Sequence, residues 1–413
     1  MASALMACAV LGACNDAGTD SSTGGSGGAP NKPAPLPKDA PVPGITDEQL
    51  VVFDKGDNLF GLPLHDADGL GPLYTRNNCA ACHTEGLRGP GLVQKMSVVE
   101  ADGFTAATDQ SKLPFGHTVH PLLTAGATTP IVPPMNDPTV KVTVRMGPPV
   151  VGRGFMEAVL DSEIERLEAE QAARPDAIHG RINHVKYASE KNPDSPFPFE
   201  KGADVIGRFG LKARIPTLDD FTADALNGDM GATSPMRPAE FPNPDGLLDD
   251  AKGGVDISLE SINLRANYMR MLDIPRAKDR PAGLERGAEL FVSLACNVCH
   301  APALKTRADY PIAPIAGKSV DVYTDFLLHD MGDALADGLE GQDGEATSRE
   351  WRTAPLMGIS QLKTFLHDGR AKSVAEAIEL HGGKGAESAD SATQYGALSE
   401  ADRQALIAFV SSL

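Results

Sequence analysis

The sequence is poor in aromatic residues, in positive charge and in long apolar runs. Aromatic side chains make up 5% of the 413 residues, and Trp351 is the single tryptophan. The formal net charge is −19, which argues against a nucleic-acid partner because a phosphate backbone is bound through basic patches. Beyond the first residues, no stretch is long and apolar enough to span a bilayer. These features are typical of a soluble chain of two or three domains whose acidic surface can attract a basic protein partner.

The N-terminus has the composition of a processing segment. Residues 2–13 are small and apolar and lead into Leu11-Gly12-Ala13-Cys14, which resembles the lipobox of bacterial lipoproteins. The apolar part has the length of a signal peptide and is too short to cross a membrane. We therefore interpret residues 1–14 as a signal peptide with a lipobox. The expectation is an exported protein of the periplasm or cell envelope, lipid-anchored through Cys14, with secretion without an anchor as the alternative.

Four cysteines follow the signal peptide, and they form two CxxC pairs. A histidine comes directly after each pair, in Cys79-Ala80-Ala81-Cys82-His83 and in Cys296-Asn297-Val298-Cys299-His300. Chance would supply roughly 0.002 such strings in a chain of this composition. On a helical turn the two thiols and the histidine share one face. The thiols can then bond the vinyl groups of one haem while the imidazole binds its iron. The sequence thus predicts two haem c groups, with His83 and His300 as iron ligands.

Two other interpretations of the cysteines are less favoured. A redox dithiol needs only the two thiols and leaves both histidines unexplained. A four-cysteine zinc site needs its two pairs within about 15–20 residues of each other, whereas these pairs lie at residues 79–82 and 296–299.

The chain can be aligned with itself around the two motifs. Residues 56–60 (GDNLF) precede the first motif as residues 287–291 (GAELF) precede the second, and an Arg-x-x-Pro string follows each motif. Strand signals are few, and residues 399–413 carry an apolar stripe expected to pack against the helix at 287–291. We therefore predict a mainly α fold of two tandem cytochrome c-like domains, each with one covalent haem, at residues 45–255 and 256–413. Residues 15–44, rich in Ser, Thr, Gly and Pro, are interpreted as a flexible linker.

The sixth position of each iron decides whether it can bind a substrate. Thr217 and Ser373 each offer an N-cap hydroxyl with an acidic residue three positions on, so both are predicted helix starts. Residues 373–381 are predicted to form a short helix with Ser373 as N-cap and Glu376 completing a capping box, which places His381 on the buried stripe. His381 is therefore a candidate ligand of the second iron, and a buried core histidine is the alternative. Its competitors are His329, Met331, Met357 and His367. The candidates for the first iron are His117, His120, Met135, Met146 and Met230.

Several separate strings of the chain resemble one known family. They occur in order as IGRFGLKA at 206–213, NGDMG at 227–231, LHDMG at 328–332 and FLHDGR at 365–370. Through them, residues 52–413 resemble the di-haem oxidoreductase family of c-type cytochromes. That family is related to the bacterial di-haem cytochrome c peroxidases and to the enzyme that matures tryptophan tryptophylquinone.

The resemblance implies two facing haem domains that exchange electrons in a peroxidase-like reaction. It implies that the second iron takes its distal ligand at the position of His381, and it places Met230 in a family string just past a comparable helix. Relatives carry an electron-relay tryptophan where residues 154–157 have none, and their distal glutamate has no match here. Glu157 and Glu163 lie nearby and are interpreted as surface carboxylates. Relatives also hold a calcium ion between the domains, and the acidic loops here are compatible with one.

Three functions fit these observations. The first is a di-haem oxidoreductase that moves electrons between its haems toward a peroxide-type substrate, with help from a general acid. The second is an envelope electron-transfer cytochrome with both irons six-coordinate and no catalysis. The third is a haem-based sensor or structural module. An open iron favours the first function and Met or His on both irons favours the second, and both require a redox partner protein.

Overall fold

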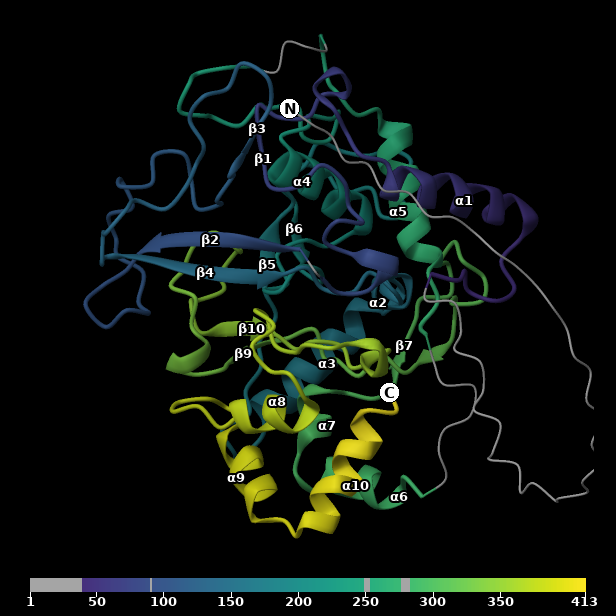
Figure 1. Cartoon of the computed structure of the whole chain (residues 1–413). Helices are drawn as coiled ribbons and strands as arrows, with labels where there is room; N and C mark the ends of the chain where they lie inside the picture. Colours follow the sequence, from purple (N-terminus) through teal and green to yellow (C-terminus); the bar gives the residue numbers. More distant parts are fainter. Residues whose placement is uncertain (1–38, 90, 249–252, 276–282) are drawn as a thin grey trace, which may run out of the picture. The chain divides into compact units, whose positions relative to one another are not determined.

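Two pairs of packed helices support the regions around the two motifs. The structure is a computed structural model and describes residues 39–89, 91–248, 253–275 and 283–413. Helix α1 (Asp47–Gly61) packs against α5 (Leu259–Met271), and α6 (Glu285–Ser293) packs against α10 (Glu400–Val410). Figure 1 shows α1 beside α5 at the upper right and α6 beside α10 at the bottom.

A glycine allows the two helices of each pair to approach closely. A Cβ atom added at Gly56 would lie 2.3 Å from the carbonyl oxygen of Leu264, and one at Gly287 would lie 2.2 Å from that of Ala405. Any side chain at these positions would therefore push the partner backbone away. The internal repeat thus encodes a helix–helix contact, and the predicted packing of the last helix on residues 287–291 is confirmed.

The remaining helices are short, and two of them begin as predicted. The Thr217 hydroxyl caps α4 by accepting from the Asp220 N–H, and the Ser373 hydroxyl caps α8 by accepting from the Glu376 N–H. The predicted capping box is wrong in one detail, because the Glu376 carboxylate accepts from the Lys372 N–H at 2.7 Å rather than from Ser373. These helices are α2 (Arg153–Ala158), α3 (Asp161–Ala172), α4 (Leu218–Met230), α7 (Cys296–Cys299), α8 (Val374–Leu380) and α9 (Ala389–Ala397).

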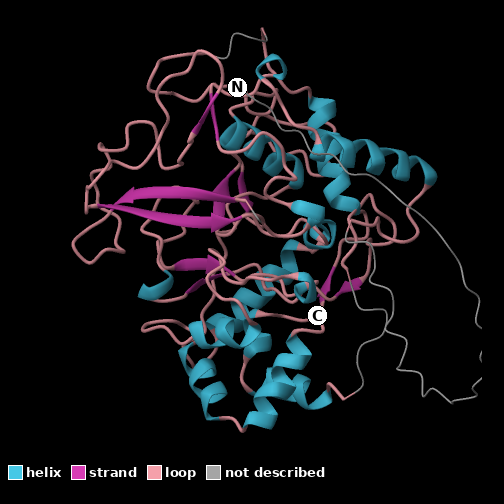
Figure 2. Ribbon diagram, in the orientation of Figure 1, coloured by secondary structure: helices cyan, strands magenta, loops and turns pink. Residues whose placement is uncertain are grey.

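The strands of the described residues form five two-stranded antiparallel sheets (Figure 2). The longest sheet pairs β2 (Leu92–Val98) with β4 (Val140–Met146), with the register running from Leu92 opposite Met146 to Val98 opposite Val140. The other pairs are β1 (Leu73–Tyr74) with β3 (Leu122–Leu123), β5 (His184–Lys186) with β6 (Asp204–Ile206), β7 (Leu304–Lys305) with β8 (Ser319–Val320), and β9 (Leu328–Asp330) with β10 (Glu350–Arg352).

The prediction of a mainly α fold with two cytochrome c-like domains is wrong. Ten α-helices accompany ten strands in the part of the chain that the structure describes, and long loops join them. The paired strands β2 and β4 follow the first motif, and β4 includes Arg145 and Met146 of the first Arg-x-x-Pro string. Apolar and polar residues alternate along residues 140–146, which is a strand signal, but most other strands are too short to show one.

The predicted domain boundary between residues 255 and 256 stays a prediction. Helix α5 lies after this boundary in the sequence, yet it packs against α1 and α4. The largest apolar core also takes buried side chains from both sides of the boundary, among them Phe155, Leu272 and Leu327.

The N-terminal predictions fall mostly outside the described residues. The signal peptide (1–14) and most of the linker (15–44) belong to residues 1–38, whereas residues 40–42 at the linker's end pair with residues 271–273. None of the described helices combines the length and the apolar composition needed to cross a bilayer.

A cluster of buried charges joins segments that are far apart in the sequence. Asp337 accepts from the Lys212 ammonium at 2.9 Å and from the Arg145 guanidinium at 2.6 Å. Asp343 also accepts from Arg145, at 2.8 Å, and lies 3.3 Å from Nε of Arg214. The side chains of Lys212 and Asp337 are fully buried, so each charge depends on its partners for compensation.

Candidate functional site: two cavities at the CxxCH motifs

Both CxxCH motifs adopt one helical turn, as predicted. The His83 N–H donates to the Cys79 carbonyl oxygen at 3.0 Å, and the His300 N–H donates to the Cys296 carbonyl oxygen at 2.9 Å. These hydrogen bonds join residues four apart and place the sulfurs and the imidazole of each motif on one face. Each motif lines its own cavity.

The first cavity has a volume of about 60 Å³ and combines apolar walls with a few charged groups. The His83 imidazole is packed against the main chain, because a Cβ atom added at Gly147 would lie 2.8 Å from its Cε1 atom. Burial lowers the pKa of His83 to about 4, although the nearby Pro148 carbonyl opposes this shift. Among the described residues no group forms a well-aligned hydrogen bond with His83 Nδ1.

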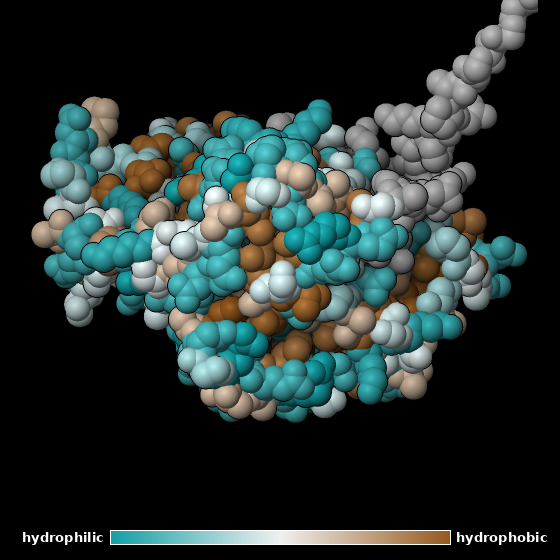
Figure 3. Space-filling view, turned by 90° about the horizontal axis from the view of Figure 1, so that it is seen from below, coloured by the Kyte–Doolittle hydropathy of each residue, from teal (hydrophilic) through white to brown (hydrophobic). Residues whose placement is uncertain are grey.

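The second cavity is larger, about 250 Å³, and is lined mainly by apolar side chains, some of which come from α6, α8, α9 and α10. Figure 3 views the molecule from below, the side on which α9 and α10 lie in Figure 1, and shows apolar residues in the middle of that face with hydrophilic residues around them. His300 Nδ1 donates to the Tyr323 carbonyl oxygen at 3.3 Å. This hydrogen bond leaves Nε2 of His300 free to bind a metal.

The structure brings His381 to the second motif and Met230 to the first. His381 follows α8 and lines the second cavity, and its Nδ1 donates to the Ala377 carbonyl oxygen at 2.6 Å, which leaves Nε2 free. Burial lowers the pKa of His300 to about 4, and the proximity of His381 adds to the effect. Met230 ends α4 and lines the first cavity. Their roles as iron ligands stay predictions.

The other candidates for the first iron do not line the first cavity. Met135 is 91% exposed, and His120 Nε2 donates to the Gly228 carbonyl oxygen at 2.7 Å. His117 Nδ1 donates to the Met96 carbonyl oxygen, and Met146 accepts from the Thr364 hydroxyl. Met269, which sequence reasoning missed, does line this cavity.

Three competitors of His381, namely His329, Met331 and His367, line the second cavity, whereas Met357 packs in the apolar core. His367 stacks on Trp351 with ring centroids 3.7 Å apart and planes 9° from parallel. Trp351 also lines this cavity, and the Lys212 ammonium lies 4.6 Å from its ring centroid. The single tryptophan is therefore on the wall of the second cavity.

The four cysteines have the properties of neutral thiols. All are free of disulfide bonds, and burial raises the pKa of each, to about 11 for Cys82 and about 12 for Cys296. A redox dithiol requires a thiolate at neutral pH. The environment therefore disfavours a thiol oxidoreductase and leaves both sulfurs of each pair available for thioether bonds.

Three arginines line the second cavity, of which Arg153 and Arg352 are buried and Arg88 is half-buried, and within the described residues none of them forms an ion pair with a carboxylate. Burial, followed by the neighbouring charge of Arg352, lowers the pKa of Arg153 to about 9, and burial lowers the pKa of Arg352 and of Arg88 to about 10. Nε of Arg88 is buried without a hydrogen-bond acceptor. All three donate to backbone carbonyl oxygens. Their uncompensated charge still favours an anionic ligand, and the two propionates of a haem are anionic groups of this kind.

The first cavity offers fewer cations that could pair with haem propionates. Arg76 and Arg265 line it, and Nε of Arg265 is buried without an acceptor among the described residues. The guanidinium of Arg265 donates instead to the Ser261 hydroxyl. The residues that would hold a haem here are Cys79, Cys82 and His83, with Met230 on the same cavity wall.

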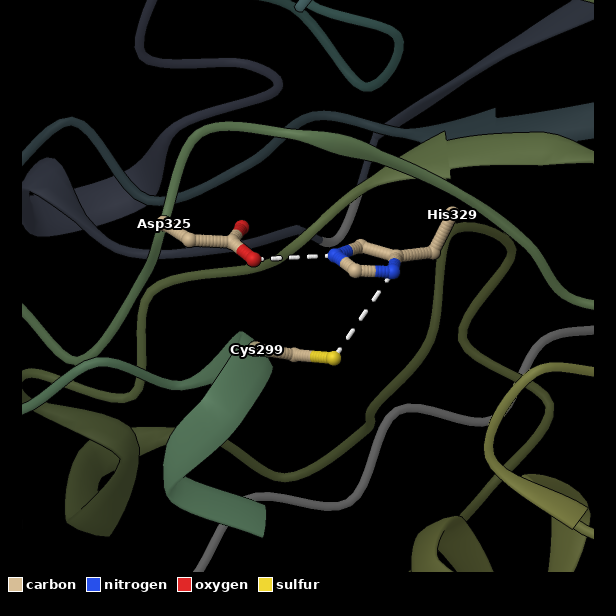
Figure 4. A group of neighbouring side chains, drawn as sticks. All are labelled: Cys299, Asp325 and His329. Carbon is tan, nitrogen blue, oxygen red and sulfur yellow. Dashed lines mark hydrogen bonds and ion pairs between the residues drawn. The ribbon is translucent and has the colours of Figure 1, made fainter. Parts of the chain in front are cut away.

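A buried histidine beside Cys299 is held between two carboxylates. His329 Nε2 lies 2.9 Å from the Asp325 carboxylate, and Nδ1 lies 2.7 Å from the Glu387 carboxylate and 3.7 Å from the Cys299 sulfur. Figure 4 shows the imidazole between Asp325 and Cys299. In the described part of the chain, Cys299, Asp325 and His329 are the group whose side chains lie close enough to hold a metal ion. This group is not an acidic loop, so the calcium prediction stays untested.

The interpretation of Glu157 as a surface carboxylate is wrong. Glu157 is buried, and its two oxygens accept from the Arg270 guanidinium at 2.7 and 3.1 Å and from the Tyr310 hydroxyl at 2.9 Å. All these donors hold the carboxylate in place, so it is not available for chemistry in either cavity. Glu163 pairs with Arg166 on α3 at 3.0 Å.

Sequence reasoning missed the residues that only tertiary contacts bring to the cavities. These are Arg88, Arg153, Arg265, Met269, Asp325, Arg352 and Glu387. Arg352 begins the second Arg-x-x-Pro string, so the internal repeat could have pointed to that residue. Asp325 and Glu387 belong to no motif of fixed spacing, so the sequence did not indicate them.

A comparison with known protein families is consistent with a pair of haem sites. Residues 129–413 match the family model described as "Di-haem oxidoreductase, putative peroxidase", and the chain therefore belongs to the di-haem oxidoreductase family. Membership implies haem cofactors and a peroxidase-like oxidoreductase function. No curated protein matches the chain.

Two solved structures show a weak likeness. One is hydrazine synthase of Kuenenia stuttgartiensis, with a TM-score of 0.38 and 13% identity over 97% of this chain and 100% of that chain. The other is a variant of the diheme peroxidase BthA of Burkholderia thailandensis, with a TM-score of 0.35 and 14% identity over 83% of this chain and 74% of that chain. Scores this low do not establish a shared fold.

Proposed function

We propose that the chain is an exported di-haem c-type cytochrome that moves electrons between two covalently attached haems toward a peroxide-type substrate. The observation that carries the proposal is the pair of CxxCH cavities. Each contains two free thiols, a proximal histidine, a second candidate ligand and arginines that form no ion pair with a carboxylate among the described residues. One set of residues with these properties is uncommon, and here it occurs twice.

The chain's own side chains prepare each site. When bound, a haem supplies an iron that exchanges single electrons and, with an open sixth position, binds peroxide. His300 presents Nε2 because its Nδ1 donates to Tyr323, and the neutral thiols of Cys296 and Cys299 are positioned for thioether bonds. Arg153 and Arg352 provide positive charge for the propionates. The apolar walls exclude water from the space around them.

A short segment connects the two cavities and supports electron transfer between them. Gly147 touches the His83 imidazole in the first cavity, while the next two residues, Pro148 and Pro149, line the second. The main-chain N–H of Met146 also donates to the His367 carbonyl oxygen at 2.9 Å. The polypeptide path from one site to the other is therefore only a few residues long.

The proposal places the protein in the periplasm or cell envelope. The lipobox-like string that ends at Cys14 supports a lipid anchor, and a net charge of −19 supports a basic redox partner protein. Globomycin, which blocks lipoprotein processing, should cause an unprocessed form to accumulate in cells. Processing that is insensitive to globomycin would contradict the anchor.

The test of the main proposal is the EPR spectrum of the oxidised protein, made in a host with haem-attachment machinery. A pyridine haemochrome assay should first show two haems per chain. A stoichiometric high-spin ferric signal beside a low-spin one, with rapid reoxidation of the reduced protein by hydrogen peroxide, would support the peroxidase-like function. A chain without covalent haem would contradict it.

A second function is favoured by one observation, the presence of Met230 and His381 in the two cavities. If both irons bind these side chains, the protein is an electron carrier without catalysis. Two low-spin EPR signals that persist after one-electron reduction, with no peroxide turnover, would support the carrier.

A further inference from the structure

The hydrogen bonds of His329 fix its charge. Ionised carboxylates can only accept hydrogen bonds, and both ring nitrogens of His329 face one, at 2.9 Å for Asp325 and 2.7 Å for Glu387. Both nitrogens therefore carry a proton, and the ring is an imidazolium. The side chains of His329 and Asp325 are 4% and 0% exposed, and that of Glu387 is 16% exposed. With two carboxylates and one imidazolium, the group retains one negative charge.

Both carboxylates accept further hydrogen bonds. The Asp325 carboxylate also accepts from the Gln171 amide at 2.8 Å and from the Leu327 N–H at 3.0 Å. The Glu387 carboxylate also accepts from the main-chain N–H groups of His179 and Asp330, each at 3.0 Å. Hydrogen bonds to the charged form favour it, so these fixed donors stabilise the negative charge.

This charged group lies at the attachment point of the second haem. His329 Nδ1 is 3.7 Å from the Cys299 sulfur, and His329 and Glu387 both line the second cavity. Gln171 joins the group to the motif, because its amide donates to the Val298 carbonyl oxygen at 3.1 Å as well as to Asp325. The charge is thus held against the motif by Gln171 of α3, His329 of β9 and Glu387, which precedes α9.

We propose that Asp325, His329 and Glu387 form an electrostatic group that lowers the reduction potential of the second haem. A buried negative charge stabilises the ferric state, which is one unit more positive than the ferrous state, and the low dielectric of the interior strengthens this interaction. The inference rests on the proposed haem attachment at Cys296 and Cys299. It assigns these three residues a positioning and tuning role rather than a catalytic one.

The test is a spectroelectrochemical titration of the two-haem protein and its variants. The double variant Asp325→Asn/Glu387→Gln removes both negative charges, so the group becomes neutral or positive whether or not His329 keeps its extra proton. The midpoint potential of one haem should rise, while that of the other stays near its original value. The haem that responds should be the one whose EPR signal changes in His381→Ala.

Two variants serve as matched controls. Asp330→Asn removes a negative charge from the same strand, but this carboxylate pairs with Arg349 and is 38% exposed, so solvent should screen its loss and neither potential should shift comparably. Glu387→Asp keeps the charge and changes the shape, so it should leave the potential near the wild-type value. An effect of packing alone would appear in Glu387→Asp as well.

The outcomes separate the inference from the function on which it rests. Two haems with unchanged potentials in the double variant, or an equal shift in Asp330→Asn, would overturn the tuning role and leave the di-haem proposal intact. A wild-type protein with no haem on the second motif would overturn both. If the double variant does not fold, Glu387→Gln alone should raise the same midpoint potential by a smaller amount, and no shift there would overturn the inference.

Discussion

The two cavities share a plan and differ in chemistry. Each has one helical turn with two thiols and a histidine, a glycine-mediated helix pair beside it, and a capped helix that carries a candidate ligand at its C-terminal end. The first cavity is small and contains two methionines. The second is larger and contains, besides His300, three histidines and three arginines.

This difference indicates that the two sites have unequal electronic roles. A methionine ligand raises the potential of a haem iron, and the first cavity offers Met230 and Met269. The second offers His381 and the negatively charged group around His329. We therefore expect the first haem to have the higher potential, so the protein holds two electrons at unequal energies.

Removing an attachment cysteine should have the largest effect on this comparison. Cys299→Ala should lose one of two covalent haems in the pyridine haemochrome assay, because one thioether bond and the geometry of the turn are lost. Cys82→Ala should lose the other haem, as shown by loss of the complementary EPR signal. Retention of both haems in either variant would disprove the attachment assignment for that motif.

Removing a candidate ligand should change one spin state at a time. His381→Ala leaves the second iron without its proposed distal nitrogen, so its EPR signal should change from low-spin to high-spin while the first signal is unaffected. Met230→Leu, which keeps a similar volume, should do the same for the first iron. If Met269 is the true ligand of that iron, Met230→Leu will leave the spectrum unchanged and Met269→Leu will change it.

Adding a methyl group at the two equivalent glycines should destabilise the two helix pairs to a similar degree. Gly56→Ala and Gly287→Ala place Cβ atoms within 2.3 and 2.2 Å of backbone carbonyl oxygens. Overpacking of this kind costs about 1–3 kcal/mol, which exceeds the gain in helix propensity of about 1 kcal/mol. Urea denaturation followed by circular dichroism should show a lower free energy of unfolding in each variant. Gly228→Ala, at a helical glycine with open space around it, is the control and should not destabilise.

Removing the two N-caps should have the smallest effect. Thr217→Ala and Ser373→Ala each delete a hydroxyl that accepts from a backbone N–H in the first turn of α4 or α8. Each should lower the free energy of unfolding by about 1 kcal/mol, measured by the same denaturation. Ser373→Asp preserves a capping acceptor and should be close to neutral, whereas a full loss in this variant would contradict the capping role.

Local patterns predicted the elements that depend on neighbouring residues. The CxxCH turns, the helix starts at Thr217 and Ser373, and the glycine contact at residue 287 follow from spacing within a few residues. The repeat around the two motifs was also visible, because both copies kept their Gly and Leu-Phe residues. These parts of the fold and of the site could be predicted from the sequence alone.

Residues that meet only after folding could not be predicted in this way. Asp325 and Glu387 are 62 positions apart in the numbering, and His329 joins them only because β9 passes between their loops. Glu157 was misread because one acidic side chain in a helix of six residues gives no sign that Arg270 will neutralise it. The short strands were not predicted for a related reason, since two or three residues cannot display the two-residue period of a strand.

The buried charge cluster of Arg145, Lys212, Arg214, Asp337 and Asp343 has a consequence for the history of this chain. Its cations precede the predicted domain boundary between residues 255 and 256, and its carboxylates follow it. Either of these two parts expressed alone would bury charges that have lost these partners, at a cost of several kcal/mol. If the repeat arose by duplication, the copies have since become dependent on each other, and a gene cut between them would encode two fragments that are stable only when they reassociate.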